Sequence, residues 1–410
     1  MKPLLSLFLL AISSASLWAG DWPQWRGAQR DDHSPDASIL HPWPAAGPKQ
    51  QWVFKEAGLG YAGFSVVGDR LYTLGAFEGG EQVICLDAVS GEKKWAAVLD
   101  KRVYPNNWGD GPRSTPTVAG DKLYALSASG VLGCLSLKDG ALVWQVDLVA
   151  DLGGELQDWG YTESVLVDGE QVICTPGGKQ GTLAALDKNT GKLRWRSAGI
   201  KEPAQYASPI LINHAGQRQV IQLLTRKVFG VNPDNGELLW ESQFPGRVAV
   251  IPTPIYRDGY LYVTAGYGVG CRLLKLGGKE PEVVYENNNM VNHHGGVILV
   301  DGKLYGHSDK GGWTCQDFLT GETLWKDESL GKGGVGFAAG HLVCVDEKSG
   351  AVALVEASPV GWKEQGRFTL SPQTTQRKPQ GKIWTHPVIV NGRLYLRDQE
   401  YLQCYDVKGS

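Results

Sequence analysis

The phrase LDKNTGKLRW, residues 186–195, returns in nearly the same form along the chain, and no other feature restricts the fold as strongly. Each copy places an Asp or Asn before a Gly, and a Trp four residues after that Gly. Asp and Asn bond to their own backbone in turns, and Gly accepts the positive φ that closes a hairpin. The residues after the Gly alternate between polar and apolar, which indicates a strand with one apolar face. Each copy therefore predicts a hairpin and a Trp that docks on a neighbouring unit; the other copies end at Trp95, Trp144, Trp240 and Trp325.

A second phrase precedes these turns and is typical of a strand, a two-residue turn and another strand. Examples are TPTVAGDKLYAL from Thr115, TPIYRDGYLYVT from Thr253 and HPVIVNGRLYLR from His386. The two phrases together predict a unit of four short strands, and no helical periodicity of useful length occurs. The 54 Gly and 15 Trp residues suit an architecture of many tight turns and large flat side chains.

The spacing of the aromatic residue on the fourth strand predicts how many units there are. Its intervals of 37 to 51 residues are typical of four-stranded propeller blades. The first of these residues has no unit before it, and the last unit lacks its fourth strand, so we expect the N-terminal strand to complete the C-terminal blade. The prediction is an all-β, eight-bladed β-propeller of four-stranded antiparallel blades. The N-terminal strand closes the ring by completing the last blade, which leaves no blade incomplete. The outer aromatic residues are Trp52, Trp95, Trp144, Trp195, Trp240, Tyr285, Trp325 and Trp362.

The first residues predict export. Residues 1–19 combine Lys2, an apolar run and a small residue at Ala19, which is typical of a secretory signal peptide. The run is too short for a permanent membrane-spanning helix. The first cysteine is Cys85, so no lipidated N-terminus is expected. We expect a soluble monomer without an integral membrane segment, in the periplasm or outside the cell.

The expected domain organisation has two parts after the signal peptide. Residues 20–44 are rich in Trp and Pro, and we predict that they form a strap packed over the propeller of residues 45–410. A plug over the channel mouth is the alternative. Lys and Arg number 40 against 43 Asp and Glu, without a basic run, so a nucleic-acid partner is not expected. Several of the seven cysteines hold equivalent places in separate units, too far apart for disulfides, so we expect buried thiols.

The phrase ALDKNTGKLRW resembles the pyrroloquinoline-quinone (PQQ) repeat of quinoprotein alcohol dehydrogenase-like propellers, and the resemblance covers residues 45–410. The stretches DWPQWRG from Asp21, WGDGPRSTPTV from Trp108 and NHHGG from Asn292 are similar to exported PQQ-binding-like propeller proteins. Outer-membrane assembly lipoproteins of the BamB kind share the repeat, which implies partner binding. Quinoprotein dehydrogenases imply instead PQQ with calcium, held by an adjacent Cys pair, a stacking Trp and acidic and amide oxygens. This chain has no adjacent Cys pair and is much shorter than those enzymes.

A binding site is expected where the innermost strands begin, because the loops that enter them form one mouth of the channel. Alignment of the units on Tyr72, Tyr124, Val172, Tyr262, Tyr305 and Tyr395 identifies the residues eleven and nine positions earlier, which share a strand face. Aromatic rings there offer stacking area, Arg113 can hold a carboxylate, and Glu163 can accept hydrogen bonds or a cation. A polar ring that only orders water is the alternative. The predicted ligand-binding residues are Tyr61, Arg113, Tyr161, Glu163, Tyr206, His294, Trp384 and His386.

Two further motifs predict no site. Neighbours on a strand point to opposite faces, so His293 and His294 are not expected to chelate one metal ion, and no metal is predicted. GKGGVG, residues 331–336, matches a dinucleotide-binding pattern but no helix follows it, so these are turn glycines.

No motif links a nucleophile, a base and an orienting group, so catalytic residues are not assigned. The leading hypothesis is an exported, non-enzymatic module that binds an unknown small molecule or envelope protein through the channel mouth, without a cofactor. The first alternative is a PQQ-dependent alcohol or sugar dehydrogenase, with Glu163 on calcium, Arg113 on a carboxylate and Trp384 as stacking platform. The second is a sugar-binding or glycan-processing role.

Overall fold

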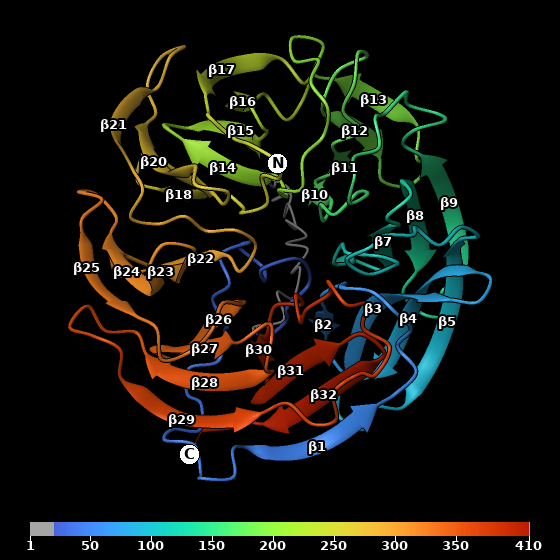
Figure 1. Ribbon diagram of the computed structural model, residues 1–410. Coiled ribbons are helices and arrows are strands. Elements are labelled where there is room, and N and C mark those ends of the chain that lie inside the picture. The colour runs from blue at the N-terminus through green and yellow to red at the C-terminus, as the bar shows by residue number, and fades with distance from the viewer. Residues whose placement is uncertain (1–19, 410) are drawn as a thin grey trace, which may run out of the picture.

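The computed structural model describes residues 20–409 and contains eight four-stranded antiparallel sheets, arranged as blades around a ring (Figure 1). The predicted eight-bladed propeller is therefore confirmed. The predicted signal peptide lies outside the described residues. Within them, no helix has the length and apolar character needed to cross a membrane.

Each of the first four blades runs in chain order from the channel outward. Blade 1 contains β2 (Ser65–Val67), β3 (Arg70–Phe77), β4 (Gly80–Asp87) and β5 (Lys93–Asp100). Blade 2 contains β6 (Thr117–Ala119), β7 (Lys122–Leu126), β8 (Val131–Ser136) and β9 (Leu142–Asp147). Blade 3 contains β10 (Leu166–Asp168), β11 (Gln171–Cys174), β12 (Ala184–Asp187) and β13 (Leu193–Arg196). Blade 4 contains β14 (Ile210–His214), β15 (Gln217–Leu223), β16 (Lys227–Val231) and β17 (Leu238–Gln243).

The remaining blades repeat this order, and only the last takes its outer strand from elsewhere. Blade 5 contains β18 (Ile255–Arg257), β19 (Tyr260–Ala265), β20 (Gly270–Lys275) and β21 (Glu282–Asn287). Blade 6 contains β22 (Val297–Val300), β23 (Lys303–Ser308), β24 (Gly312–Asp317) and β25 (Thr323–Asp327). Blade 7 contains β26 (Val335–Ala338), β27 (His341–Val345), β28 (Ala351–Glu356) and β29 (Glu364–Thr369). Blade 8 contains β30 (Val388–Val390), β31 (Arg393–Asp398), β32 (Tyr401–Asp406) and β1 (Lys49–Phe54).

The ring is closed by the first strand of the chain. β1 pairs antiparallel with β32, with Trp52 opposite Cys404 and Gln50 opposite Tyr405. Figure 1 shows the blue β1 outside the red β32. The prediction that the N-terminal strand completes the last blade is thus confirmed, and blade 8 obtains its fourth strand without adding residues at the C-terminus.

The repeated phrase joins five of the blades to the blade before them. In blade 3 the turn residue Gly191 has a φ of 70°, and a Cβ added there would lie 2.8 Å from the ring of Trp144 in blade 2. Trp144 also donates its indole N–H to the carbonyl of Lys188 in the same turn, at 2.9 Å. The turn therefore needs Gly both for its conformation and for the space that the neighbouring Trp fills. The same glycine contact recurs between Gly91 and Trp52, Gly140 and Trp95, Gly236 and Trp195, and Gly321 and Tyr285.

A matched pair of glycine substitutions tests this docking. Gly140→Ala should lower the free energy of unfolding by about 2–3 kcal/mol, because strain at positive φ adds to the overlap with Trp95. Gly120 also has a positive φ, of 63°, but nothing lies within 4 Å of an added Cβ. Gly120→Ala should therefore cost only the strain, about 1 kcal/mol. Chemical denaturation of both variants gives the comparison; equal losses would show that the Trp contact contributes nothing.

Blade 7 departs from the predicted pattern. Trp362 lies before β29, and the outer position opposite Leu354 is held by Gly366, so the assignment of Trp362 to the outer strand is wrong. A Cβ on Gly366 would lie 2.5 Å from the Cβ of Trp43. The backbone N–H of Trp43 donates to the carbonyl of Gln365 at 2.7 Å. A Trp from the N-terminal segment thus packs at the outer position of this blade.

Residues 20–44, which we call the channel segment, enter the centre of the ring before they reach blade 8 (Figure 1). Its main chain and side chains bond to all eight blades, mostly at the innermost strands. These contacts place the segment inside the channel, whereas the sequence predicts a strap over the propeller, with a plug over its mouth as the alternative. The bonds join Trp22 to Val66, Pro23 to Val118, Arg30 to Ser164 and Pro209, Trp25 to Thr253, Arg26 to Val297, Ser34 to Phe337, and Asp36 to Asn391.

Two buried arginines hold the channel segment. Arg30 donates to the carbonyls of Ser164 at 3.1 Å and Pro209 at 2.7 Å, and burial lowers its pKa to about 9. Arg26 pairs with Asp32 at 2.7 Å, both inside the segment. These guanidinium groups supply donors to carbonyls at the inner edges of the blades, where no further strand can pair.

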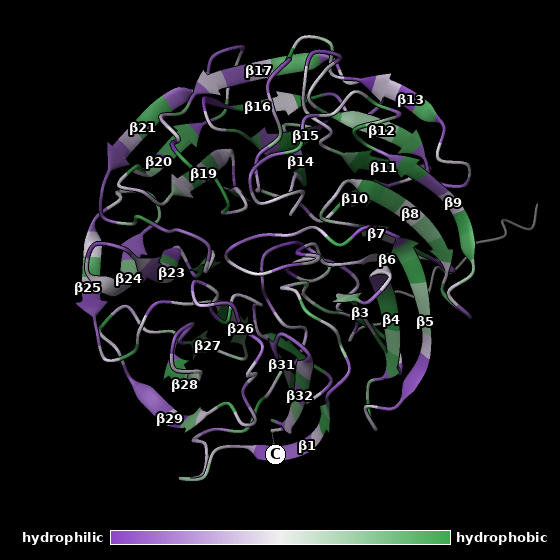
Figure 2. Ribbon diagram, turned by 45° about the vertical axis from the view of Figure 1, so that its right-hand side comes forward, coloured by the Kyte–Doolittle hydropathy of each residue, from purple (hydrophilic) through white to green (hydrophobic). Residues whose placement is uncertain are grey.

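The blades pack through apolar layers between them. Figure 2 shows hydrophobic residues concentrated on inner and middle strands such as β4 and β8, while the outer strands β29 and β1 carry more polar residues. All seven cysteines are buried and unpaired, as expected from their equivalent places in separate blades. The core is therefore distributed around the ring, and the loops at the mouth are free to carry polar and aromatic groups.

Candidate functional site: an aromatic mouth above the channel segment

The loops that enter the innermost strands meet at one end of the channel and enclose a pocket of about 210 Å³. They come from every blade except blade 7, and Trp25 and Arg26 of the channel segment also line the pocket. Because the channel segment occupies the ring centre, the pocket is a hollow at one mouth. The lining residues with rings or charge are Trp25, Arg26, Tyr61, Trp108, Arg113, Trp159, Tyr206, Tyr267, His293, His294, Trp384 and His386.

Most of the residues that the sequence selects meet here. The structure brings together Tyr61, Arg113, Tyr206, His294, Trp384 and His386 in this one pocket. Apart from Tyr206, whose unit is aligned through Pro209, they lie eleven or nine residues before equivalent positions of the second strand. The alternation of side chains between the two faces of a strand thus continues in the loops, because the chain is already extended before each inner strand begins.

Tyr161 and Glu163 do not line the pocket, so their prediction as residues of the channel mouth is wrong. Ile173 pairs with Ala185 in the way that Tyr124 pairs with Cys134, so Val172 is the wrong residue on which to align blade 3. The one-residue error exchanges the two faces of the strand. Thr162 and Ser164 line the pocket in their place.

The side chains of Tyr161 and Glu163 form hydrogen bonds behind the pocket wall. Tyr161 donates its hydroxyl to the carbonyl of Pro176 at 2.8 Å. Both carboxylate oxygens of Glu163 accept from Thr175, one from its N–H and one from its hydroxyl. Burial raises the pKa of Glu163 to about 7, although these hydrogen bonds act to lower it. Glu163 therefore serves the packing of blade 3.

Five aromatic residues of the pocket do not follow from the alignment of the repeats. Trp108 and Trp159 come from two successive loops, and each is followed by Gly, so the repeated Trp-Gly pair is a signal that could have identified them. Tyr267 lies in the turn between β19 and β20, outside the aligned positions. His293 was considered only as a metal ligand. Trp25 belongs to the channel segment, which has no repeat to align.

The rings form two connected groups around the pocket. On one side Trp159 stands edge-on to Trp108, with centroids 5.7 Å apart, and to Tyr206 at 5.6 Å. On the other side Tyr61 and Trp384 lie 4.9 Å apart, and Trp384 is 5.6 Å from His294. Flat walls of this kind bury the apolar faces of a ligand at little conformational cost.

A histidine and carboxylate network forms one wall. His294 Nε2 lies 2.7 Å from Glu347 Oε2, and the indole N–H of Trp384 donates to the same oxygen at 3.0 Å. Burial works to raise the pKa of Glu347, but the hydrogen bond and charge of His294 outweigh it, so the pKa is lowered. Glu347 therefore stays ionised and fixes the orientation of both rings. Next to it, Lys332 pairs with Asp309 at 2.7 Å and contacts His293 Nδ1 at 2.7 Å.

His386 lies deeper, against the ring of Trp25 at 4.7 Å. Its Nε2 donates to the carbonyl of His294 at 2.9 Å, because a carbonyl can only accept. Burial lowers the pKa of His386 to about 4, so the ring is neutral at physiological pH and its Nδ1 is an acceptor. That Nδ1 has no partner in the described residues.

The stability of the fold should depend on pH through His386. An unfolded histidine has its ordinary pKa of 6.5, so between pH 6.5 and about 4 the unfolded chain binds a proton that the folded chain rejects. Stability is therefore complete above pH 6.5 and falls as the pH drops to about 4, by up to about 3 kcal/mol from this residue. Denaturation across this range should show a flatter slope for His386→Gln than for the wild type. Lys192→Gln, at an exposed position in a turn of blade 3, should leave the slope unchanged, and equal slopes for all three proteins would contradict the assignment.

Arg113 lies at the pocket with its guanidinium beside two tyrosine rings, 5.6 Å from the centroid of Tyr61 and 5.8 Å from that of Tyr104. Its terminal nitrogens donate to the carbonyls of Gly111 at 2.5 Å and Gly109 at 2.6 Å. Burial lowers the pKa of Arg113 but leaves it a cation. The loop thus orients Arg113 through its own carbonyls.

Of the three residues proposed for PQQ and calcium, Arg113 and Trp384 line the mouth, whereas Glu163 does not. Glu163, the proposed calcium ligand, is turned away from the pocket and is bonded to Thr175. No three His, Cys, Asp or Glu side chains within residues 20–409 gather to hold a metal ion. A calcium ion needs six to eight oxygen ligands, and this mouth presents aromatic and imidazole groups instead.

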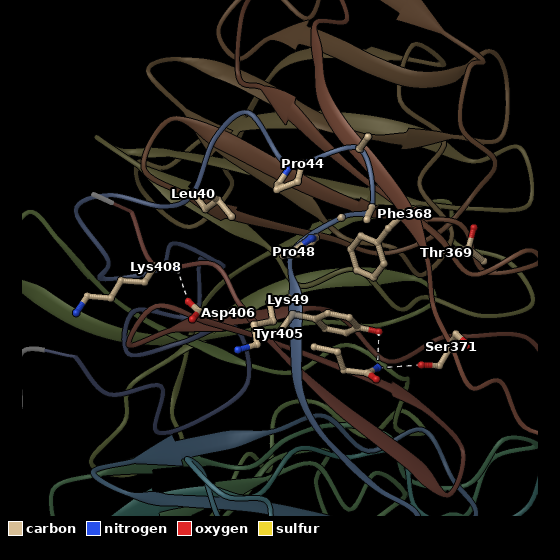
Figure 3. A pocket seen from close by; sticks show the side chains of 14 residues that line it. Leu40, Pro44, Pro48, Lys49, Phe368, Thr369, Ser371, Tyr405, Asp406 and Lys408 are labelled. Atoms are coloured by element: carbon tan, nitrogen blue, oxygen red, sulfur yellow. Dashed lines mark hydrogen bonds between the residues drawn. The ribbon is translucent and has the colours of Figure 1, made fainter.

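A second hollow lies at the seam where β1 joins β32 (Figure 3). It is an open groove of about 880 Å³ between the end of the channel segment and blades 7 and 8. Its polar groups bond to one another: Gln50 donates to the carbonyl of Ser371 at 2.9 Å and to the hydroxyl of Tyr405 at 3.1 Å. The mouth is the stronger candidate site because it gathers aromatic rings, histidines and Arg113 around one pocket.

Comparisons with known proteins agree with this fold. Residues 103–327, which are 225 of the 410, match the family described as outer membrane protein assembly factor BamB. BamB of Yersinia pestis is 22% identical over 325 residues, covering 78% of this chain and 67% of that protein. BamB of Bordetella pertussis is 28% identical over 138 residues, covering 34% of this chain but only 31% of its own length.

Two solved structures share the architecture. BamB from Moraxella catarrhalis superposes with a TM-score of 0.62 at 16% identity, covering 88% of this chain and 99% of that one. Quinohaemoprotein alcohol dehydrogenase from Comamonas testosteroni gives a TM-score of 0.65 at 11% identity, covering 95% of this chain and 81% of that one. At these identities the structures show the fold alone. Since the family match extends over more than half of the sequence, the chain belongs to the family of outer membrane protein assembly factor BamB, built on the PQQ repeat.

Proposed function

We propose that this protein is an exported, non-catalytic binding module of the cell envelope, and that it holds a ligand or a segment of a partner protein in its aromatic mouth. One observation carries the proposal: rings from seven loops and from the channel segment converge on one pocket of about 210 Å³. The mouth has oriented donors and acceptors but no linked nucleophile, base and orienting group. The family relatives are named as assembly factors, which supports a role in binding.

Capture from envelope extract tests the proposal. Immobilised protein should retain a binding component, and Trp159→Ala and Arg113→Ala should each lose it, because they remove a wall and the charged group of the mouth. Tyr161→Phe is the matched control, since its hydroxyl bonds inside the wall to Pro176 and does not reach the pocket. A component that the mouth variants retain as well as the wild type binds elsewhere, and the proposal then falls.

The quinoprotein alternative predicts a different result with the same protein. A ligand that binds only the folded state raises the melting temperature. PQQ with calcium should therefore raise the melting temperature if the chain holds that cofactor, and we expect no shift because Glu163 is unavailable to calcium. A calcium-dependent shift that Trp384→Ala removes would favour the dehydrogenase and overturn the binding module.

A further inference from the structure

Of the two arginines that line the mouth, Arg113 alone has no ion-pair partner within residues 20–409, and the carboxylates of Glu81 and Asp110 act on it only from a greater distance. Arg26 pairs with Asp32, and Lys332 next to the pocket pairs with Asp309. No carboxylate of the described residues lies within 4 Å of the nitrogens of Arg113, which bonds only to main-chain carbonyls. Each terminal nitrogen of Arg113 still has a second hydrogen, and Nε has no partner within residues 20–409. A guanidinium in this state is prepared for an anionic oxygen from outside the chain.

The carboxylate of Glu347 does not compete for that role. It already accepts from His294 and Trp384, and it lies on the histidine wall. The guanidinium of Arg113 would therefore attract an anionic ligand and repel a cationic one. The charge pattern favours a ligand with one negative group.

The histidine wall adds hydrogen-bond acceptors. His294 contacts Glu347 through Nε2, and its Nδ1, which is an acceptor when the ring is neutral, has no partner in the described residues. His386 gives its Nε2–H to the carbonyl of His294 and has a second free acceptor at Nδ1. Ligand hydroxyl groups are the natural donors to such acceptors.

The remaining walls are aromatic and the space is small. About 210 Å³ is less than the roughly 300–1,000 Å³ of pockets for drug-sized ligands, so the mouth suits a single ring. The faces of Trp and Tyr rings carry negative potential, which favours the C–H groups on one face of a saturated ring. Tyr61 and Trp384, with ring centroids 4.9 Å apart and planes inclined at 48°, provide such ring faces beside Arg113.

We propose that the mouth binds a uronate, a sugar ring with hydroxyl groups and one carboxylate, either free or at the end of an oligosaccharide. The carboxylate bonds to Arg113, one face of the ring lies on Tyr61 and Trp384, and hydroxyl groups donate to the imidazoles of His294 and His386. This inference rests on the proposed function of the mouth as a binding site and names its ligand class.

Titration of the full chain tests the ligand class. Tryptophan fluorescence and calorimetry should show that D-glucuronate binds at least about tenfold more tightly than its methyl ester or D-glucose, which keep the ring but lack the charge. Arg113→Gln should remove this preference while weak binding of all three sugars remains. Arg194→Gln, on the exposed outer strand of blade 3, is the control and should bind as the wild type does. The melting temperature of Arg113→Gln shows whether its loop is intact, and Arg113→Lys should retain part of the preference. The affinity for trigalacturonate, compared with that for galacturonate, shows whether the mouth binds the end of an oligosaccharide or only a free sugar.

Three outcomes would overturn the inference: equal affinity for glucuronate and its methyl ester, tighter binding of benzoate than of glucuronate, or no binding of glucuronate, galacturonate and trigalacturonate. If uronates fail but Trp159→Ala still loses the component captured from envelope extract, the ligand class is wrong and the binding mouth stands. If both experiments fail, the proposed function falls as well.

Discussion

Removing residues 20–54 should abolish the cooperative unfolding transition of this protein. The deletion takes away β1, which pairs along β32, and it takes away the channel segment that bonds to all eight blades. It also removes the buried side chains of Trp22, Ile39 and Trp43. The loss exceeds the roughly 5–15 kcal/mol by which a domain is stable, and it leaves an open edge on blade 8. Circular dichroism on heating should show a broad, non-cooperative change, and gel filtration should show aggregation.

A circular permutant separates the two contributions. If residues 45–54 are moved behind residue 409 through a short linker, β1 can return to its place without the channel segment. This protein should regain a cooperative transition at a melting temperature below that of the full chain. A truncated chain that melts as cooperatively and at the same temperature as the full chain would show that neither closure nor channel segment stabilises the ring.

Arg397→Leu should lower the free energy of unfolding by about 5 kcal/mol or more. Arg397 is fully buried in β31 and connects blade 8 to blade 1, and burial lowers its pKa to about 9. Its removal leaves several buried carbonyls without a donor, each costing about 1–3 kcal/mol. The accepting groups are the carbonyls of Ala57, Gly58, Ala62, Leu74 and Gln399 and the hydroxyl of Thr73.

The control for this substitution lies on the same strand. Arg393 is only half-buried and donates to the carbonyl of Asn391 at 3.2 Å, so Arg393→Leu should cost less than about 1 kcal/mol. Urea denaturation of both variants measures the difference. Similar losses for Arg397→Leu and Arg393→Leu would contradict the role of Arg397 as the link between the last and first blades.

The ring could be predicted from the sequence because its determinants are local. Asp187 accepts the N–H groups of Asn189 and Thr190, and four residues later Gly191 takes positive φ against Trp144, all within one repeated phrase. Such a pattern predicts the local structure because all the residues that form the turn and its contact are close together in the sequence. Blade 7 was assigned less well because Trp43, far away in the sequence, occupies the place that a local Trp holds in other blades.

The mouth was predicted in part for the same reason. Tyr61, His294 and Trp384 follow from the alternation of strand residues, which a correct alignment transfers from blade to blade. In blade 3 no Tyr marks the second strand, and the choice of Val172 in place of Ile173 moved the prediction to Tyr161 and Glu163. The path of the channel segment could not be derived, because Arg26 and Arg30 bond to carbonyls of distant blades.

The central claim is a ring closed by its own first strand, and a disulfide across the closure tests it most directly. Lys49 lies opposite Asp406 in the pairing of β1 with β32, and residues opposite each other in antiparallel strands are about 4.5–5.5 Å apart at Cα, within disulfide range. Because the seven native cysteines are buried, Lys49→Cys with Asp406→Cys places the two accessible thiols at the seam. Lys49→Cys with Lys192→Cys, in the exposed turn of blade 3, is the control pair. Mild oxidation of the folded protein should link the first pair within one chain, as peptide mass spectrometry would show, and should leave the second pair free. Failure of the first pair to link, with both thiols reactive in the folded chain, would contradict the closed ring.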